Sequence, residues 1–211
     1  MSDVEKRLAE VYGATSASEL SKTYDDWAAS YDEDMLRTGY AHPAIICGLI
    51  SRFVGDLAAP VLDAGVGTGN VGQLLHTLGY SNLHGFDMSE GMLAKARARG
   101  IYNGLHRGVL GEALDFNSSS YVAILSTGTF TTGHAPPSAF VELARILRPH
   151  GHLIFTVGEM LWREGGFAAA LEKLVTAGQL RPVWQTGPYH PMPHSKTESH
   201  FTTLALVYQR N

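Results

Sequence analysis

The stretch Val61-Leu62-Asp63-Ala64-Gly65-Val66-Gly67-Thr68-Gly69 decides the fold of this 211-residue chain. It begins as a short apolar strand that contains a carboxylate, and its glycines then recur at every second position before a helical pattern starts at Asn70. Glycine suits such a turn because it adopts backbone angles that other residues avoid, and because it lets a ligand lie against the main chain. The stretch therefore predicts a strand, a glycine turn and a helix, with a ligand site at the turn.

The same turn distinguishes between two classes of nucleotide ligand. Dinucleotide-binding proteins use the pattern Gly-x-Gly-x-x-Gly, and this chain has Asn70 where the third glycine of that pattern would stand. The next predicted strand ends in Asp87, where a carboxylate can accept hydrogen bonds from two ribose hydroxyls. The carboxylate of Asp63, beside the turn, would repel a pyrophosphate and attract an ammonium. S-adenosylmethionine has an ammonium, a sulfonium and a ribose but no phosphate, so the pattern predicts it as the cofactor.

Further strands and helices alternate along the chain, as in a parallel sheet with helices on both faces. The strands are predicted at residues 60–64, 83–87, 121–125 and 152–157, with a short one near 105–108. The helices between them are predicted at residues 70–78, 90–99 and 138–147. The last part of the chain is predicted to form a helix at 167–177 and two strands near 182–186 and 201–208. Such a final pair of strands would make an antiparallel edge of the sheet.

About 55 residues precede the first predicted strand, and they read as helices. Thr23 and Asp26 have the spacing of a helix-capping pair. Large side chains then recur at intervals of three and four and are expected to share one helix face: Tyr24, Trp27, Tyr31 and Met35. Such a stripe either packs on the domain as ordinary core or covers a ligand.

The organisation predicted from these elements is a single α/β domain over residues 1–211. Within it we expect a helical N-terminal lid over 1–55, a cofactor-binding core over 56–160, and a C-terminal helix with antiparallel edge strands over 161–211. No repeat or long linker divides the chain.

Composition and charge exclude several classes of partner. The formal net charge is −4, so the chain lacks the broad positive field of nucleic-acid-binding proteins. The single cysteine, Cys47, excludes an intrachain disulfide, and the apolar run 44–50 around it predicts a thiol packed on a helix face. That run is too short to cross a bilayer, and the first residues lack the pattern of a signal peptide. We therefore expect a cytoplasmic protein with neither a nucleic acid nor a membrane as partner.

Three stretches together resemble the class I S-adenosylmethionine-dependent methyltransferases. They are the glycine motif at 61–69, Asp87 with the following Met88-Ser89-Glu90-Gly91-Met92-Leu93, and Leu143-Ala144-Arg145-Ile146-Leu147-Arg148-Pro149-His150-Gly151. Within this superfamily, Tyr24-Asp25-Asp26-Trp27-Ala28-Ala29-Ser30-Tyr31-Asp32 is similar to the methyltransferase-like proteins named after the Williams-Beuren syndrome region. The resemblance covers about residues 20–160 and implies a doubly wound, Rossmann-like sheet of seven strands, mostly parallel. It also implies methyl transfer that leaves S-adenosylhomocysteine.

The resemblance assigns cofactor contacts to residues of the glycine motif and of the second strand. Gly65, Gly67 and Gly69 would line the methionine end of the cofactor. Asp63 would hold the ammonium, directly or through water. Asp87 would bind the ribose.

Other contacts implied by the resemblance involve the adenine and the sulfonium. Met88 would lie against the adenine face, and Gly111 and Glu112 stand where many relatives place an Asp against the adenine amino group, so their main chain or the Glu112 carboxylate would substitute. The aromatic residues of the N-terminal stripe would close over the cofactor, because ring faces attract a sulfonium; they are Tyr24, Trp27 and Tyr31.

On the acceptor side the sequence offers candidates but no catalytic set. Displacement at a sulfonium needs mainly positioning and exclusion of water, and a base is required only when the acceptor starts protonated. His134 and Glu159 follow the fourth and fifth strands and are the candidates for acceptor binding, although each also fits an ordinary surface role. No metal site is predicted, because prolines beside His190 and His194 prevent a shared helix face.

These observations predict an enzyme that methylates an unidentified acceptor small enough to enter a pocket beside the N-terminal lid. Two alternatives stay open. One is a catalytically silent S-adenosylmethionine-binding partner or activator of another methyltransferase, and the other is a protein methyltransferase.

Overall fold

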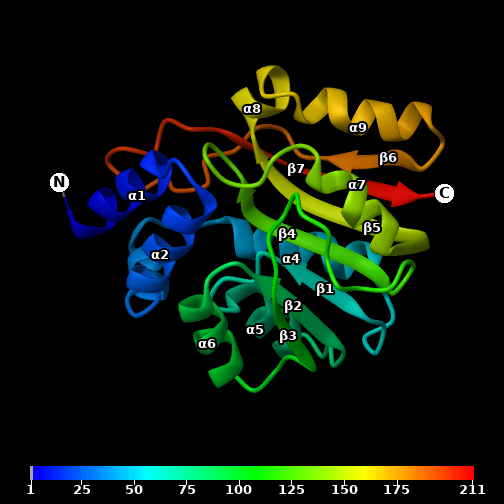
Figure 1. Cartoon of the computed structure of the whole chain (residues 1–211), viewed down its shortest axis with the longest axis horizontal. Coiled ribbons are helices and arrows are strands. Elements are labelled where there is room, and N and C mark those ends of the chain that lie inside the picture. Colours follow the sequence, from blue (N-terminus) through cyan, green and yellow to red (C-terminus); the bar gives the residue numbers. More distant parts are fainter. Residues whose placement is uncertain (1) are drawn as a thin grey trace.

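A twisted sheet of seven strands, in the order β3-β2-β1-β4-β5-β7-β6, forms the centre of the protein in the computed structural model, which describes residues 2–211 (Figure 1). The strands are β1 (Val61–Ala64), β2 (Leu83–Asp87), β3 (Gly104–Arg107), β4 (Tyr121–Phe130), β5 (Leu147–Gly158), β6 (Leu180–Gln185) and β7 (Thr203–Arg210). The first five strands pair in parallel, and β7 runs antiparallel to both of its neighbours, β5 and β6. The predicted doubly wound, mostly parallel α/β fold with an antiparallel edge pair is therefore confirmed.

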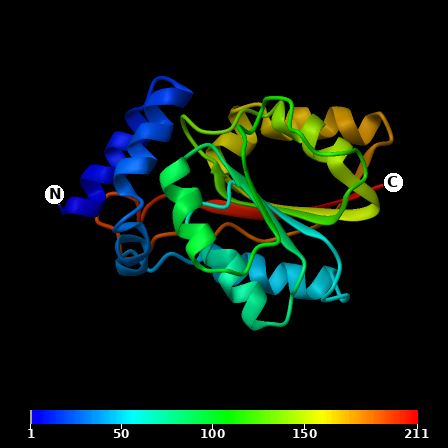
Figure 2. The ribbon, with the colours of Figure 1, turned by 60° about the horizontal axis from the view of Figure 1, so that its bottom comes forward.

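Helices cover both faces of the sheet, and the N-terminal helices lie beyond the carboxyl ends of its parallel strands (Figure 2). The helices are α1 (Asp3–Gly13), α2 (Ala17–Trp27), α3 (Tyr31–Arg37), α4 (His42–Phe53), α5 (Asn70–Thr77), α6 (Glu90–Ala98), α7 (Ala139–Ile146), α8 (Glu159–Glu164) and α9 (Phe167–Thr176). The pair α4 and α5 lies on the face opposite α7 and α9, while α1 and α2 lie beyond the end of the sheet (Figures 1 and 2). None of these helices is both long and apolar enough to span a bilayer.

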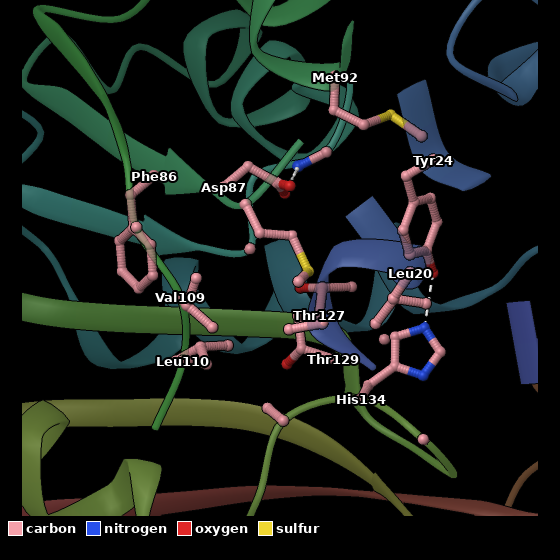
Figure 3. A pocket seen from close by; sticks show the side chains of 18 of the residues that line it. Leu20, Tyr24, Phe86, Asp87, Met92, Val109, Leu110, Thr127, Thr129 and His134 are labelled. Atoms are coloured by element: carbon pink, nitrogen blue, oxygen red, sulfur yellow. Dashed lines mark hydrogen bonds between the residues drawn. The ribbon is translucent and has the colours of Figure 1, made fainter. Parts of the chain in front are cut away.

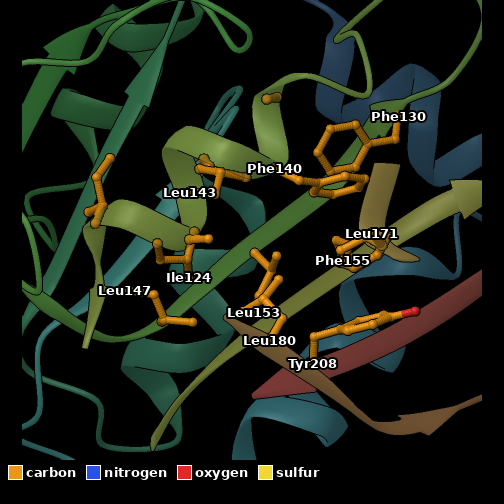
Figure 4. Close-up of a cluster of buried hydrophobic side chains, with 14 of the residues drawn as sticks. Ile124, Phe130, Phe140, Leu143, Leu147, Leu153, Phe155, Leu171, Leu180 and Tyr208 are labelled. Carbon is orange, nitrogen blue, oxygen red and sulfur yellow. The ribbon is translucent and has the colours of Figure 1, made fainter. Parts of the chain in front are cut away.

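The central strands contribute to two apolar cores because successive side chains point to opposite faces of a sheet. In β4, for example, Ile124 joins the core under α7 and α9, and its neighbours Ala123 and Leu125 join the core under α4 and α5. The first core contains packed rings, with Phe130 and Phe140 centroids 4.7 Å apart (Figure 4). Both cores hold the ends of β1, β2 and β4 at fixed positions.

The boundaries of several elements differ from the sequence-based expectation. Strands β4 and β5 are longer than predicted, and β5 continues through Arg148–Gly151, a stretch that reads as a turn. Helix α8 has no counterpart in the prediction. Cys47 lies buried in α4 as expected.

The prediction of one N-terminal helix that carries the whole aromatic stripe was wrong. Helix α2 begins after Ser16, whose Oγ accepts a hydrogen bond from the Glu19 amide (3.2 Å), so Thr23 lies inside the helix and is not its cap. The helix ends at Trp27, and α3 starts only at Tyr31. The aromatic side chains still meet, with ring centroids of Trp27 and Tyr31 4.9 Å apart, because residues 28–30 form a tight turn between the two helices.

Candidate functional site

The chain turns sharply between β1 and α5 through three glycines with positive φ. Gly65 (φ 80°), Gly67 (φ 53°) and Gly69 (φ 84°) all lie in the region that side chains disfavour. A Cβ at Gly67 would meet no atom within 4 Å, since this position borders open space. A Cβ at Gly65 would collide with the methyl group of Thr129, and one at Gly69 would contact Tyr102 at 3.1 Å. Gly65 and Gly67 thus form part of a cavity wall, whereas Gly69 begins α5 outside it.

Asp87, the last residue of β2, lies at the wall of this cavity (Figure 3). Its Oδ2 accepts a hydrogen bond from the Gly67 amide (2.8 Å) and its Oδ1 accepts one from the Ser89 amide (3.0 Å). Burial raises the pKa of Asp87, while these main-chain donors and that of Met88 oppose the rise. The two bonds fix the carboxylate at the cavity wall and leave it further capacity to accept hydrogen bonds.

A first cavity of about 210 Å³ lies between the glycine turn, the end of β2 and helix α2. Figure 3 shows Asp87, Met92, Val109 and Leu110 around it. Most of its wall is apolar, but Thr127 Oγ1 is buried there and has no hydrogen-bond partner among residues 2–211. Apolar walls with a few fixed polar groups are typical of small-molecule sites.

Two carboxylates of the N-terminal helices attach them to the core beside this cavity. In α2, Asp25 Oδ1 accepts hydrogen bonds from Ser89 Oγ (2.6 Å) and from the Gly91 amide (2.7 Å). Both donors belong to the start of α6, where free amides favour a negative charge.

In α3, Asp32 makes the second attachment. Its Oδ1 accepts hydrogen bonds from Thr68 Oγ1 (2.5 Å) and Asn70 Nδ2 (2.8 Å), and its Oδ2 pairs with Arg99 Nη2 (2.7 Å). Asp25 and Asp32 were not predicted as site residues, although each follows a tyrosine of the aromatic stripe. The repeated Tyr-Asp pair, at 24–25 and 31–32, is the sequence feature that could have indicated these two attachments.

A second cavity of about 470 Å³ adjoins the first. Its wall comes from the N-terminal helices, the ends of β4 and β5, and the segment 191–203. Among the described residues, those that border both cavities are Tyr24, Tyr31, Gly128 and His134. They form the boundary between the two spaces.

Tyr24 and His134 are joined by a hydrogen bond at this boundary (Figure 3). The phenol oxygen lies 2.8 Å from Nε2, and Nδ1 lies 2.9 Å from the carbonyl oxygen of Thr132. Because a carbonyl only accepts, Nδ1 carries the proton and Nε2 accepts from the phenol. Burial lowers the pKa of His134, so the ring is neutral at neutral pH.

Other predicted site residues lie at different distances from the first cavity. Met88 borders it, whereas Trp27 borders only the second, with Nε1 donating to Asp34 Oδ2 (2.9 Å). Glu159 also borders only the second, where its carboxylate accepts from Thr202 Oγ1 (2.6 Å) and pairs with an arginine. Within residues 2–211 no three His, Cys, Asp or Glu side chains gather in a way that would hold a metal ion.

Asp63, Gly111 and Glu112 lie outside the lining of the first cavity. Asp63 Oδ2 accepts a hydrogen bond from the Tyr102 hydroxyl (3.0 Å). Burial raises the pKa of Asp63 to about 7, the Tyr102 hydrogen bond opposes this, and the Asp87 charge adds to it. Gly111 packs toward Pro136 and Glu112 is exposed, so residues 108–110 form this part of the wall.

Comparison with known proteins gives a consistent set of relatives. A family described as a methyltransferase domain matches residues 62–155. Methyltransferase-like protein 27 of Homo sapiens is 30% identical over 203 residues, which cover 90% of this chain and 82% of the relative.

Solved structures extend the similarity to the fold. A protein described as a methyltransferase, in complex with the Trm112 methyltransferase activator of Haloferax volcanii, has a TM-score of 0.65 at 22% identity, covering 88% of this chain and 96% of that one. An S-adenosylmethionine-dependent methyltransferase of Thermotoga maritima has a TM-score of 0.63 at 16% identity, covering 89% and 97%.

Proposed function

The chain belongs to the class I S-adenosylmethionine-dependent methyltransferases, and from this premise we propose that its first cavity binds the cofactor and its second cavity binds a small methyl acceptor. The observation that carries the proposal is the shared boundary of the two cavities at Tyr24, Tyr31, Gly128 and His134. A methyl donor and its acceptor must meet, and two adjoining cavities allow each to enter its own space.

The residues of the first cavity fit the chemistry of S-adenosylmethionine. Gly65 and Gly67 would face the methionine end of the cofactor. A side chain at residue 67 would occupy the open space that the cofactor needs. Asp87 would accept the ribose hydroxyls with the oxygen capacity that its two amide bonds leave. Met88 would pack on the adenine, and the unpartnered hydroxyl of Thr127 offers a further polar contact.

The remaining cofactor contacts are assigned from the position of each residue relative to the first cavity. The main chain near Leu110 would take the adenine edge, since Leu110 borders the cavity and Glu112 is exposed. Asp63 would act on the ammonium from behind the turn, through water. Gly69 would serve the turn itself.

When bound, S-adenosylmethionine supplies an electrophilic methyl group on a positively charged sulfur. The protein's part is to orient both molecules and to exclude water. Tyr24 and Tyr31 stand at the boundary, where aromatic rings attract a positive sulfur. His134 and Glu159 are the proposed acceptor contacts, and the one basic nitrogen of the neutral His134 ring, Nε2, already accepts a hydrogen bond from the Tyr24 hydroxyl.

A small-molecule acceptor is favoured because the second cavity, of about 470 Å³, lies between the N-terminal helices and the segment 191–203. The Haloferax volcanii neighbour was solved with an activator protein, which is compatible with a protein partner for this chain. A catalytically silent binding partner and a protein methyltransferase are the alternatives that the experiment must separate. A cytoplasmic location stays a prediction from the sequence.

Calorimetry with S-adenosylhomocysteine, followed by turnover with a labelled methyl donor, tests the proposal. We expect the wild type to bind, and Asp87→Ala to bind more weakly by about 1–3 kcal/mol through lost hydrogen bonds. Asp115→Ala, at an exposed aspartate, is the matched control. Labelled product should arise from a metabolite pool, not from protein or RNA. Absence of binding would overturn the proposal, and binding without product would favour the silent partner.

A further inference from the structure

A buried carboxylate in the wall of the second cavity lacks any partner within the described chain. Glu198 lies between β6 and β7 and is only 7% exposed. Its Oε2 has no hydrogen-bond partner, and no ion pair among residues 2–211 includes it. Buried carboxylates are normally paired, because loss of water is costly for a charge. An unpaired one at a cavity wall indicates that a ligand supplies the partner.

The charges of the remaining wall show which kind of ligand fits. No Lys or Arg is among the described residues that border this cavity. Burial lowers the pKa of His42 to about 3 and also lowers that of His134, so neither ring offers a positive charge at neutral pH. The other carboxylate of the wall, Glu159, is already bound to Arg163 and Thr202. His200 is exposed, and its ring lies tilted against Phe201, with centroids 4.1 Å apart.

The rest of the wall is mainly aromatic and aliphatic. Aromatic rings border it on several sides: Tyr12, Tyr24, Trp27, Tyr31, Tyr40 and Phe130. Burial and the charge of Glu198 raise the pKa of Tyr12 to about 12, which agrees with a phenol close to this carboxylate. Such rings favour an apolar body and also attract a cation.

We propose that Glu198 is the anchor for a positively charged amine, and that the acceptor is therefore a small aromatic amine whose ammonium lies at Glu198. This inference rests on the proposed function, because it takes the second cavity as the acceptor site. The carboxylate selects the positive head group, the rings hold the body, and the bound molecule extends to the boundary at Tyr24 and His134.

Three indoles with different head groups test the proposal: tryptamine, tryptophol and indole-3-acetate, which carry an ammonium, a hydroxyl and a carboxylate. Each is titrated by calorimetry at neutral pH into protein saturated with S-adenosylhomocysteine. We expect wild-type protein to bind tryptamine at least about tenfold more tightly than tryptophol, and indole-3-acetate most weakly. Glu198→Gln should reduce the preference to within about threefold. Glu164→Gln, at an exposed glutamate of α8, removes the same charge outside the cavity. This variant should keep the preference for tryptamine.

The proposal is overturned if wild-type protein shows no preference for tryptamine, or if Glu198→Gln retains it. The wild-type comparison needs no variant, so it stays informative even if Glu198→Gln folds poorly. Titration with S-adenosylhomocysteine alone comes first. Its failure would remove the proposed function, whereas its success without a preference for the amine would remove only this inference.

Discussion

The phenol oxygen of Tyr24 lies 2.8 Å from Nε2 of His134, and this contact stands where the two cavities meet. Tyr24 comes from an N-terminal helix and His134 from the loop after β4, so the bond joins the N-terminal helices to the sheet. A second phenol and histidine pair, Tyr189 and His42, has the same separation of 2.8 Å, but Tyr189 borders neither cavity. A comparison of the two pairs therefore separates a role of Tyr24 in ligand binding from a role in stability.

Tyr24→Phe keeps the ring and removes the hydroxyl, so His134 loses its partner at Nε2. We expect the free energy of unfolding to fall by about 1 kcal/mol, the usual net contribution of a hydrogen bond. Affinity for S-adenosylhomocysteine should fall several-fold, because the ring at the boundary is no longer fixed. Tyr189→Phe should lose similar stability without losing affinity. Equal effects of both variants on affinity, measured by calorimetry, would contradict a role for Tyr24 in binding.

Gly67→Ala places a methyl group in the open space of the first cavity. The change also forces alanine into a positive φ, at a cost of about 1 kcal/mol in stability. Gly100 is the matched control, because it has φ 66° and no atom within 4 Å of an added Cβ, and it lies outside both cavities. Both variants should lose similar stability by denaturant unfolding. Only Gly67→Ala should lose affinity for S-adenosylhomocysteine, by about tenfold or more.

Asp25 and Asp32 attach the N-terminal helices beside the first cavity, so their loss should speed release of the ligand. We expect the double variant Asp25→Ala, Asp32→Ala to release S-adenosylhomocysteine at least about tenfold faster, since interface changes act mainly on dissociation. Stopped-flow displacement measures the rate. Asp26→Ala is the control from the same segment, as Asp26 is exposed and pairs with exposed Lys22 (3.4 Å). An unchanged rate in the double variant would show that these helices do not retain the ligand.

The fold was predictable because its signals are local in sequence. The strand and glycine turn at 61–69 and the apolar runs near residues 83 and 121 can each be recognised without the rest of the chain. Strands β1 and β2 match these predictions closely, and β4 starts at the predicted residue but continues to Phe130. The break between α2 and α3 was not predictable, since spacings of three and four continue across residues 28–30 and mimic one helix.

The site was predictable only where a motif carries it. Asp87 and Gly67 belong to such a motif and lie at the cavity wall. The hydrogen bond between Asp25 and Ser89 joins positions 64 residues apart, so no local pattern predicts it. Glu112 was expected to contact the adenine because of its place in the family pattern, but its side chain is exposed. Glu198 lies in a loop without periodicity, and only the folded chain brings it to a cavity. Tertiary position decided these roles.

We expect Asp63 to make cofactor binding depend on pH. Its pKa is raised to about 7 in the folded chain, so the carboxyl is mostly protonated at pH 6, whereas in the unfolded chain it would be ionised. The folded state therefore holds the extra proton between about pH 4 and 7, and the stability contribution of this group falls as pH rises through that window. An ammonium near Asp63 favours the carboxylate and lowers this pKa, so ligand binding should release the proton.

We expect S-adenosylhomocysteine to release up to about one proton at pH 6 and almost none at pH 8.5, where Asp63 is already ionised. Calorimetry in two buffers of different ionisation enthalpy gives the number of protons released on binding. Methylthioadenosine, which lacks the amino acid part, should release no proton from Asp63. Asp63→Asn should abolish the difference between the two ligands. The same release by both ligands in the wild type would mean that the ammonium does not act on Asp63.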